Sequence, residues 1–278
     1  PSNVSAKLGP KDPEKAAEKI AEAISRLKIK DLRFKNFLGA VIIPVHWSQI
    51  EPNQGEFNWN AVDQRIGLPL EEQIDYWSKN GKNVILRVFP YGQQRGNDIT
   101  PDWVKEKVTQ ITFESRKENR GLVTIPKVWD EEFMQVYAPF VHELAQKYDN
   151  DKRVLGVQIG IGHLGFWTAQ PSQEGRQAFM EAGFSLPIWK EYVLSVVDLY
   201  SSEFKNKKLF LSVEPLFLEP IANDIDVAKE IVEYAAKKNY VFLFKGVDSD
   251  EQKFERTGFK EVLSHLTSLD LPNLTCGF

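Results

Sequence analysis

The chain has 278 residues, a length that suits one large domain better than two small ones. Hydrophobic residues make up 42% and charged residues 27%, a globular balance, and no apolar run reaches the roughly 20 residues that a membrane span requires, so we expect a soluble protein and no membrane partner. Lys and Arg total 35 against 39 Asp and Glu, giving a net charge of −4 without a basic stripe, which argues against nucleic acid as a partner.

The first elements in the chain are predicted to be a helix and then a buried strand. In residues 13–27, apolar side chains recur every three or four positions and charged ones lie between them, which indicates an amphipathic helix. Residues 39–45 form a short, nearly continuous apolar run. Such a run is typical of a strand that is buried on both faces of a parallel sheet.

The same alternation continues to the end of the chain. Further helices are predicted at residues 70–79, 131–147, 187–203, 226–238 and 260–267, and further strands at 83–89, 154–160, 209–213, 240–244 and 274–278. Alternating strands and helices indicate right-handed βαβ crossovers and a parallel sheet.

The parallel sheet is expected to close into a barrel. No Gly-rich phosphate-binding sequence follows any strand, which argues against an open, doubly wound nucleotide-binding sheet. We therefore predict the α/β class and a (β/α)8 TIM barrel, with residues 1–278 as a single domain. Six strands are visible and residues 3–8 could supply another, so the barrel is expected to be incomplete or irregular at its ends.

One connection, residues 90–130, is much longer than the others. Residues 108–114 and 122–125 predict a hairpin whose turn lies at 118–121. This hairpin is expected to overhang the carboxyl ends of the strands, where long ordered loops commonly form cleft walls or lids.

The most specific sequence follows the strand at 39–45 and reads HWSQIEPNQGEFNW, from His46 to Trp59. It resembles the strand-two signature of clan A glycoside hydrolases, particularly the family 42 β-galactosidases, in which Trp, Ile-Glu-Pro, Gly and Phe-x-Trp recur in this order. Residues 100–103 and 154–159 resemble later parts of the same families, so the likeness covers about residues 39–165. It implies a barrel that acts on β-linked saccharides. Glu51, Phe57 and Trp59 are expected to be loop scaffold.

Aromatic and polar residues gather at the predicted carboxyl ends of the strands. A sugar ring offers an apolar face for stacking and hydroxyl groups for hydrogen bonds, so this mixture fits a carbohydrate site. The expected substrate-binding residues are His46, Trp47, Arg87, Tyr91, Trp103, Gln158, Phe166, Trp167 and Asp248, with Gln93, Arg95 and Trp129 as further candidates. His46 and Trp47 are equally compatible with a scaffold role, Arg87 with a structural ion pair, and Asp248 with a turn or cap. Trp77 and Trp189 are assigned to the core.

A retaining glycosidase needs two carboxyl groups roughly 5 to 5.5 Å apart. The resemblance implies glutamates at the ends of strands four and seven. At strand four the sequence reads QIGIGHLGFW and holds no carboxylate, which leaves His163 as a candidate acid, with a plain hydrogen-bonding role as the alternative. At strand seven, residues 274–278, the nucleophile is expected at or beyond Phe278. Glu214, directly after the strand at 209–213, is the best catalytic carboxylate, although a role as a loop cap or as a partner of Arg87 or Lys245 is slightly favoured.

Three functions are therefore open. The first is a glycoside hydrolase that uses two carboxylates, the second a carbohydrate-binding pseudoenzyme without the acid/base, and the third a storage or structural barrel without a ligand. No cofactor is expected, and the histidines at positions 46, 142, 163 and 265 lack the spacing of metal ligands. Cys276 is alone, so no disulfide forms within the chain. Oligomeric state and compartment stay open, and acceptor triplets at Asn3 and Asn273 are compatible with secretion.

Overall fold

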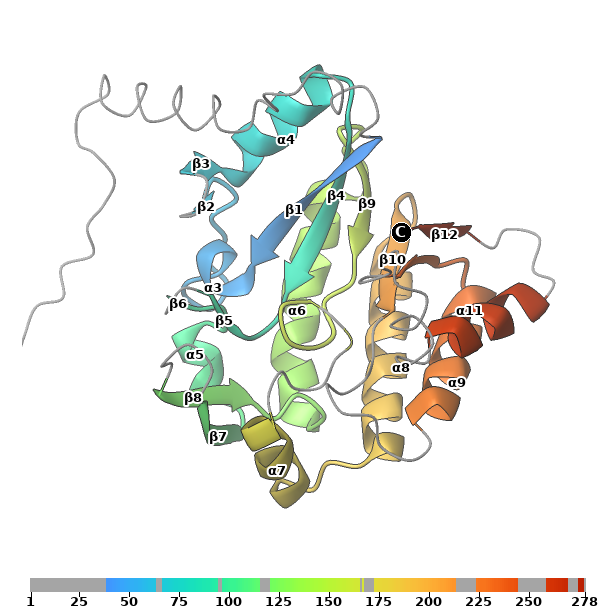
Figure 1. Cartoon of the computed structure of the whole chain (residues 1–278). Coiled ribbons are helices and arrows are strands. Elements are labelled where there is room, and N and C mark those ends of the chain that lie inside the picture. The colour runs from blue at the N-terminus through green and yellow to red at the C-terminus, as the bar shows by residue number, and fades with distance from the viewer. Residues whose placement is uncertain are drawn as a thin grey trace, which may run out of the picture.

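The computed structural model describes residues 39–63, 67–94, 97–115, 121–165, 167, 173–213, 224–244, 259–269 and 275–277. The helix predicted at 13–27 and the strand suggested at 3–8 lie outside these ranges, as do Arg95, Phe166, Glu214 and Asp248. Within the described part of the chain, the molecule is built around one six-stranded sheet with helices packed beside it (Figure 1).

All neighbouring strands of this sheet are parallel. Their order is the order in which they follow along the chain: β1 (Ala40–His46), β4 (Asn83–Phe89), β9 (Val154–Gln158), β10 (Lys208–Val213), β11 (Val241–Phe244) and β12 (Thr275–Gly277). The predicted α/β class with a parallel sheet is thereby confirmed. A doubly wound sheet reverses its strand order at a switch point, and these strands show no reversal. Closure into a barrel stays a prediction, because the described strands form an open series.

A helix connects each strand to the next. The connecting helices are α4 (Leu70–Lys79), α6 (Glu131–Tyr148), α8 (Leu186–Glu203), α9 (Asp224–Lys237) and α11 (Phe259–Ser268). Each was predicted to within two residues at either end. Among the described helices, none has the length and apolar character needed to traverse a lipid bilayer.

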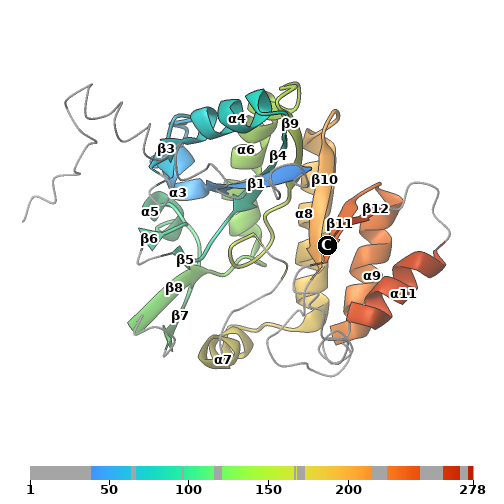
Figure 2. The ribbon, with the colours of Figure 1, turned by 45° about the horizontal axis from the view of Figure 1, so that its top comes forward.

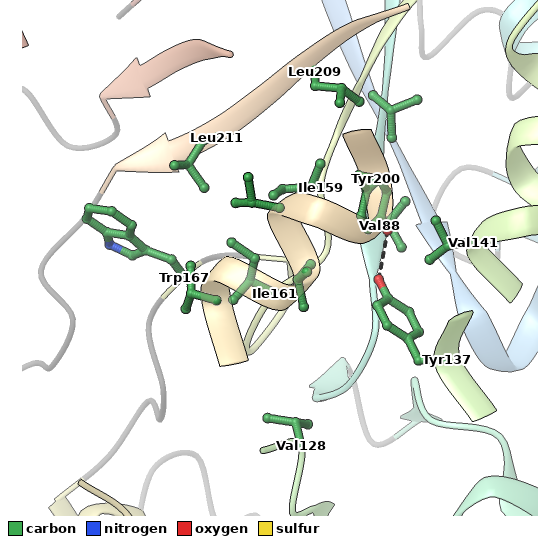
Figure 3. Close-up of a cluster of buried hydrophobic side chains, with 14 of the residues drawn as sticks. Val88, Val128, Tyr137, Val141, Ile159, Ile161, Trp167, Tyr200, Leu209 and Leu211 are labelled. Carbon is green, nitrogen blue, oxygen red and sulfur yellow. Dashed lines mark hydrogen bonds between the residues drawn. The ribbon is translucent and has the colours of Figure 1, made fainter. Parts of the chain in front are cut away.

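The core lies between the sheet and these helices. In β4, Val84, Leu86 and Val88 have no exposed surface and their neighbours Ile85 and Phe89 are also buried, so both faces of the strand are covered, as its continuous apolar sequence predicts. Figure 3 shows part of the core, where side chains of β4, of the segment after β9, of β10 and of the helices surround the hydrogen-bonded pair Tyr137 and Tyr200. Trp77 and Trp189 are buried in the core, as predicted.

The long connection between β4 and α6 contains the predicted hairpin. Its strands β7 (Gln110–Ser115) and β8 (Gly121–Pro126) are antiparallel, and they lie beyond the carboxyl ends of β1 and β4 (Figures 1 and 2). Three helices were not predicted: α3 (Trp47–Ile50), α5 (Asp102–Lys105) and α7 (Gln173–Glu181), of which α7 packs against β7. Two short strand pairs complete the described elements, β2 (Val62–Asp63) with β3 (Leu68–Pro69) and β5 (Gln93–Gln94) with β6 (Asn97–Asp98).

Candidate saccharide site at the strand ends

The parallel sheet brings the ends of β1, β4 and β9 to one edge. His46 and Phe89 are register partners at the last positions of β1 and β4, and Arg87 pairs with Gln158 of β9. Because parallel strands expose their carboxyl ends at the same edge, the loops that follow them share this side of the molecule. Several of the predicted site residues therefore lie close together.

Arg87 and two rings form the first part of this edge. The His46 ring stacks on Phe89 with centroids 5.1 Å apart, and the Arg87 guanidinium lies 5.0 Å from the centre of the Phe89 ring. Arg87 also donates from Nε and Nη2 to the carbonyl oxygen of Leu164, at 3.1 and 2.8 Å. The partly exposed arginine thus fixes the segment that follows β9 against the end of β4.

His163 lies beside the loop that follows β4. It forms an isolated parallel bridge with Tyr91, their rings meet edge to face at 6.3 Å, and the Leu164 amide donates to the Tyr91 carbonyl at 3.0 Å. Gly92 leaves room for the imidazole, since a Cβ at that position would lie 3.0 Å from His163 Cδ2. Burial raises the pKa of the Tyr91 hydroxyl, which stays neutral, whereas His163 is partly exposed. We call His46, Arg87, Phe89, Tyr91 and His163 the rim cluster.

The segment after β9 is held from behind by hydroxyl and indole groups of two helices. Tyr137 of α6 donates to the Gly160 carbonyl at 2.9 Å, Tyr192 of α8 to Ile161 at 2.7 Å, and the Trp189 indole to Trp167 at 3.1 Å. These anchors were missed in the sequence, although tyrosines within the apolar stripe of a helix are a usable signal, because a buried hydroxyl needs a partner.

Five of the predicted substrate-binding residues are buried, two of them in the rim cluster. Trp47, Tyr91, Gln158 and Trp167 have at most 2% of their surface exposed, and His46 has 7%. A side chain without exposed surface cannot contact a sugar in this conformation. Trp47 instead packs at ring distances of 5.2 and 5.3 Å on Tyr137 and Phe140 of α6.

Glu51 and its neighbours form the loop scaffold expected from the sequence. The carboxylate accepts from the Trp47 indole and from the Gly55 amide, both at 2.8 Å, and closes the turn after α3. Phe57 and Trp59 stack on each other at 5.7 Å next to α6. Trp103 donates its indole hydrogen to the Glu51 carbonyl at 3.1 Å. The Trp103 side chain is partly exposed and does not belong to the rim cluster.

The described residues supply neither the acid/base glutamate nor a metal site. Residues 159–165, directly after β9, contain no carboxylate. Glu214, Asp248 and Phe166 lie outside the described residues, so their predicted roles stay predictions. In the part of the chain that is described, no cluster of three His, Cys, Asp or Glu side chains is arranged to hold a metal ion.

A sequence model of the glycoside hydrolase 42 family, described as beta-galactosidase, matches residues 13–179, more than half of the chain. No curated protein matches.

Solved structures give distant likenesses. An endo-1,4-beta-xylanase from Caldicellulosiruptor owensensis is 12% identical, with a TM-score of 0.45, over 83% of this chain and 60% of that one. A beta-galactosidase from the psychrophilic Marinomonas ef1 is 14% identical, with a TM-score of 0.44, over 84% of this chain and 38% of that one. The chain therefore spans less than two thirds of the length of either protein.

Proposed function

Because the chain belongs to the glycoside hydrolase 42 family, described as beta-galactosidase, we propose that it binds a β-linked oligo- or polysaccharide at the rim cluster and hydrolyses a glycosidic bond there. The match to residues 13–179 confirms the resemblance expected from the motif at 46–59.

Binding is supported above all by the contact between Arg87 and the Leu164 carbonyl. This contact places a guanidinium and the His163 imidazole at one edge, next to the stacked rings of His46 and Phe89. A guanidinium and an imidazole hydrogen-bond to vicinal hydroxyl groups, and the buried rings of His46 and Phe89 hold the guanidinium in place from behind. Two partly exposed hydrogen-bond donors suit the hydroxyl groups of a sugar better than a fully apolar ligand.

Hydrolysis requires a carboxylate and a proton donor near the anomeric carbon. Glu214 directly follows β10, whose carboxyl end is at the same edge of the sheet as those of β4 and β9. In the proposal, Glu214 is the catalytic carboxylate. His163, in the segment where the family resemblance implies an acid/base glutamate, donates a proton to the leaving oxygen.

One observation favours a second candidate, saccharide binding without hydrolysis. The segment that follows β9, residues 159–165, contains no carboxylate. It consists largely of glycines and of Ile159 and Ile161, which are both 1% exposed. Family membership does not guarantee the family's chemistry when a catalytic side chain is missing.

Turnover of aryl β-glycosides and binding to a glycan panel test the proposal together. Wild type should release the aryl group, and Glu214→Gln should lower kcat by about 10² to 10⁴-fold with glycan binding retained. Glu106→Gln, which removes an exposed carboxylate after α5, should have no effect. Arg87→Lys keeps the charge but loses the forked contact to Leu164, so it should weaken glycan binding about tenfold.

The outcomes separate the candidates. Binding by wild type without any turnover would replace hydrolysis by the second candidate. Absence of both binding and turnover across the panel would overturn the proposal and favour a structural barrel without a ligand.

A further inference from the structure

A second hollow lies away from the rim cluster, between the turn after α3, helix α5 and one face of α6. Its volume is 320 Å³, and its walls include Glu51, Gln54, Phe57 and Trp103 on one side and Gln135 and Glu143 of α6 on the other. α3 and α5 lie on the same side of α6 in both views of the fold (Figures 1 and 2). None of the wall residues belongs to the rim cluster, and the buried Trp47 packs directly behind Trp103 at a ring distance of 5.9 Å.

The walls combine aromatic rings, amides and carboxylates. Trp103 and Phe57 are both partly exposed, and the side chains of Gln54 and Gln135 are exposed at the mouth. Aromatic faces with adjacent amides and carboxylates are the groups that recognise sugar rings. At 320 Å³ the hollow is at the small end of ligand pockets, which run from about 300 Å³ upwards, so it suits one ring better than a chain of them.

The charge of the pocket walls determines which class of sugar the pocket favours. Both ionisable wall residues are glutamates. Glu51 is 3% exposed and forms no ion pair with any described residue, and burial, with a further contribution from the repulsion of Glu143, raises the pKa of its carboxyl. Lys107 is not a wall residue, but its ammonium group contacts Gln54 and lies 5.6 Å from the centre of the Trp103 ring. Glu143 is partly exposed, and a cation beside it is attracted by both glutamates.

We propose that this pocket binds a single hexosamine, with its apolar face on Trp103 and its protonated amino group held by Glu143, while the buried carboxylate of Glu51, which accepts from Trp47 and Gly55, adds to the attraction. A metal ion is a poorer occupant, because the described residues offer no group of three acidic or histidine ligands. A uronic acid is excluded by repulsion from the two glutamates. The inference does not rest on the rim site or on hydrolysis.

Calorimetric titration of the full chain with glucosamine, glucose and glucuronate tests this assignment at neutral pH. Glucosamine should bind at least about tenfold tighter than glucose, which differs by a hydroxyl in place of the amino group, and glucuronate should not bind. Glu143→Gln should lower the affinity for glucosamine to that for glucose. Glu132→Gln removes an exposed carboxylate from the same helix outside the pocket and should change nothing.

Three results would overturn the assignment: equal affinity for glucosamine and glucose, no effect of Glu143→Gln, or no binding of glucosamine at all. Arg87→Lys separates this pocket from the rim. Loss of glucosamine binding in that variant but not in Glu143→Gln would place the ligand at the rim cluster and overturn the inference as well. Unchanged unfolding midpoints of both variants show that the fold is intact.

Discussion

Glu51 shows how much one carboxylate contributes to the loop that leaves β1. Its carboxylate accepts a hydrogen bond from the Trp47 indole, which has no exposed surface. Without the carboxylate, the indole N–H therefore has no access to water as a replacement acceptor. The second acceptor oxygen closes the turn at Gly55, whose φ of 76° favours glycine. The expectation that Glu51 supports the loop followed from its place in the motif, but its near-complete burial did not.

We predict that Glu51→Gln lowers the free energy of unfolding by about 1 to 3 kcal/mol at a pH near 4.5, because an amide cannot accept from both donors. The pKa of Glu51 is raised above 4.5 mainly by burial, so the folded protein holds its proton to higher pH than the unfolded chain does. Wild type therefore loses stability as the pH rises above 4.5, and the difference from Glu51→Gln should narrow.

Urea unfolding at several pH values measures this difference. Glu56→Gln is the matched control, since Glu56 is exposed in the same loop and should change stability by less than about 0.5 kcal/mol. A difference that widens with rising pH would show that ionised Glu51 stabilises the fold, contrary to the expectation.

At the scale of elements, the segment after β9 approaches β4 closely at Gly165. A Cβ at this glycine would lie 2.2 Å from the Val88 carbonyl oxygen, and its φ is 74°. Gly55 has nearly the same φ, 76°, but open space around it. The two glycines therefore separate the cost of a left-handed backbone from the cost of a steric clash.

Gly55→Ala should cost about 1 to 2 kcal/mol, the price of a left-handed residue with a side chain. Gly165→Ala should cost clearly more, because β4 or the segment after β9 must also shift, and it should weaken glycan binding through displacement of the Leu164 carbonyl from Arg87. Unfolding midpoints and glycan affinity of both variants give the comparison. Equal costs with unchanged binding would mean that the approach to Val88 relaxes freely.

The sequence predicted the regular elements well, and the reason is their periodicity. Helix 70–79 and strand 83–89 were placed at their observed bounds, because the amphipathic stripe of the first and the apolar run of the second are unbroken. α7, with the sequence QEGRQAFME, has only three apolar side chains, which are adjacent in the sequence, and it packs on β7. α3 and α5 are four residues each, too short to show a helical period.

The site was less predictable than the fold. Residue types suggested a sugar site, but exposure depends on which distant element packs against each side chain. Trp47 is covered by Tyr137 and Phe140 of α6, about ninety residues further along the chain. No pattern in the sequence near Trp47 predicts that contact. The mixture of rings and polar groups could be read from the sequence, whereas the division into a rim cluster and a second pocket required the structure.

At the scale of the whole molecule, ion pairs hold the amino end of β9 and the carboxyl ends of the strands carry the candidate site. Arg153, which precedes β9, pairs with Glu71 of α4 at 2.8 Å and also with Asp75 and Asp151. Tyr148 of α6 donates to the same Glu71 at 2.9 Å. One guanidinium thus connects α4 to the entrance of β9, and Glu71 joins α6 to them.

Arg153→Ala should lower the free energy of unfolding by about 1 to 2 kcal/mol at neutral pH, a modest value because the side chain is one third exposed and water screens the charges. Hydrogen bonds from Arg153 lower the pKa of Asp75 and Asp151 below 3.8. The stabilisation is therefore present above pH 3.8 and is lost as the pH falls through the lowered values, so wild type and variant should converge in acid.

Lys79→Ala is the matched control for this cluster. Lys79 contacts the same Asp75 at 3.6 Å but is 77% exposed, so its removal should cost less than about 0.5 kcal/mol. Glycan binding should be unchanged in both variants, because the cluster lies at the opposite strand ends from Arg87 and His163. A loss of binding in Arg153→Ala at a temperature where the variant is fully folded would show that the two ends of the sheet are coupled, and that the amino-end charges position the rim.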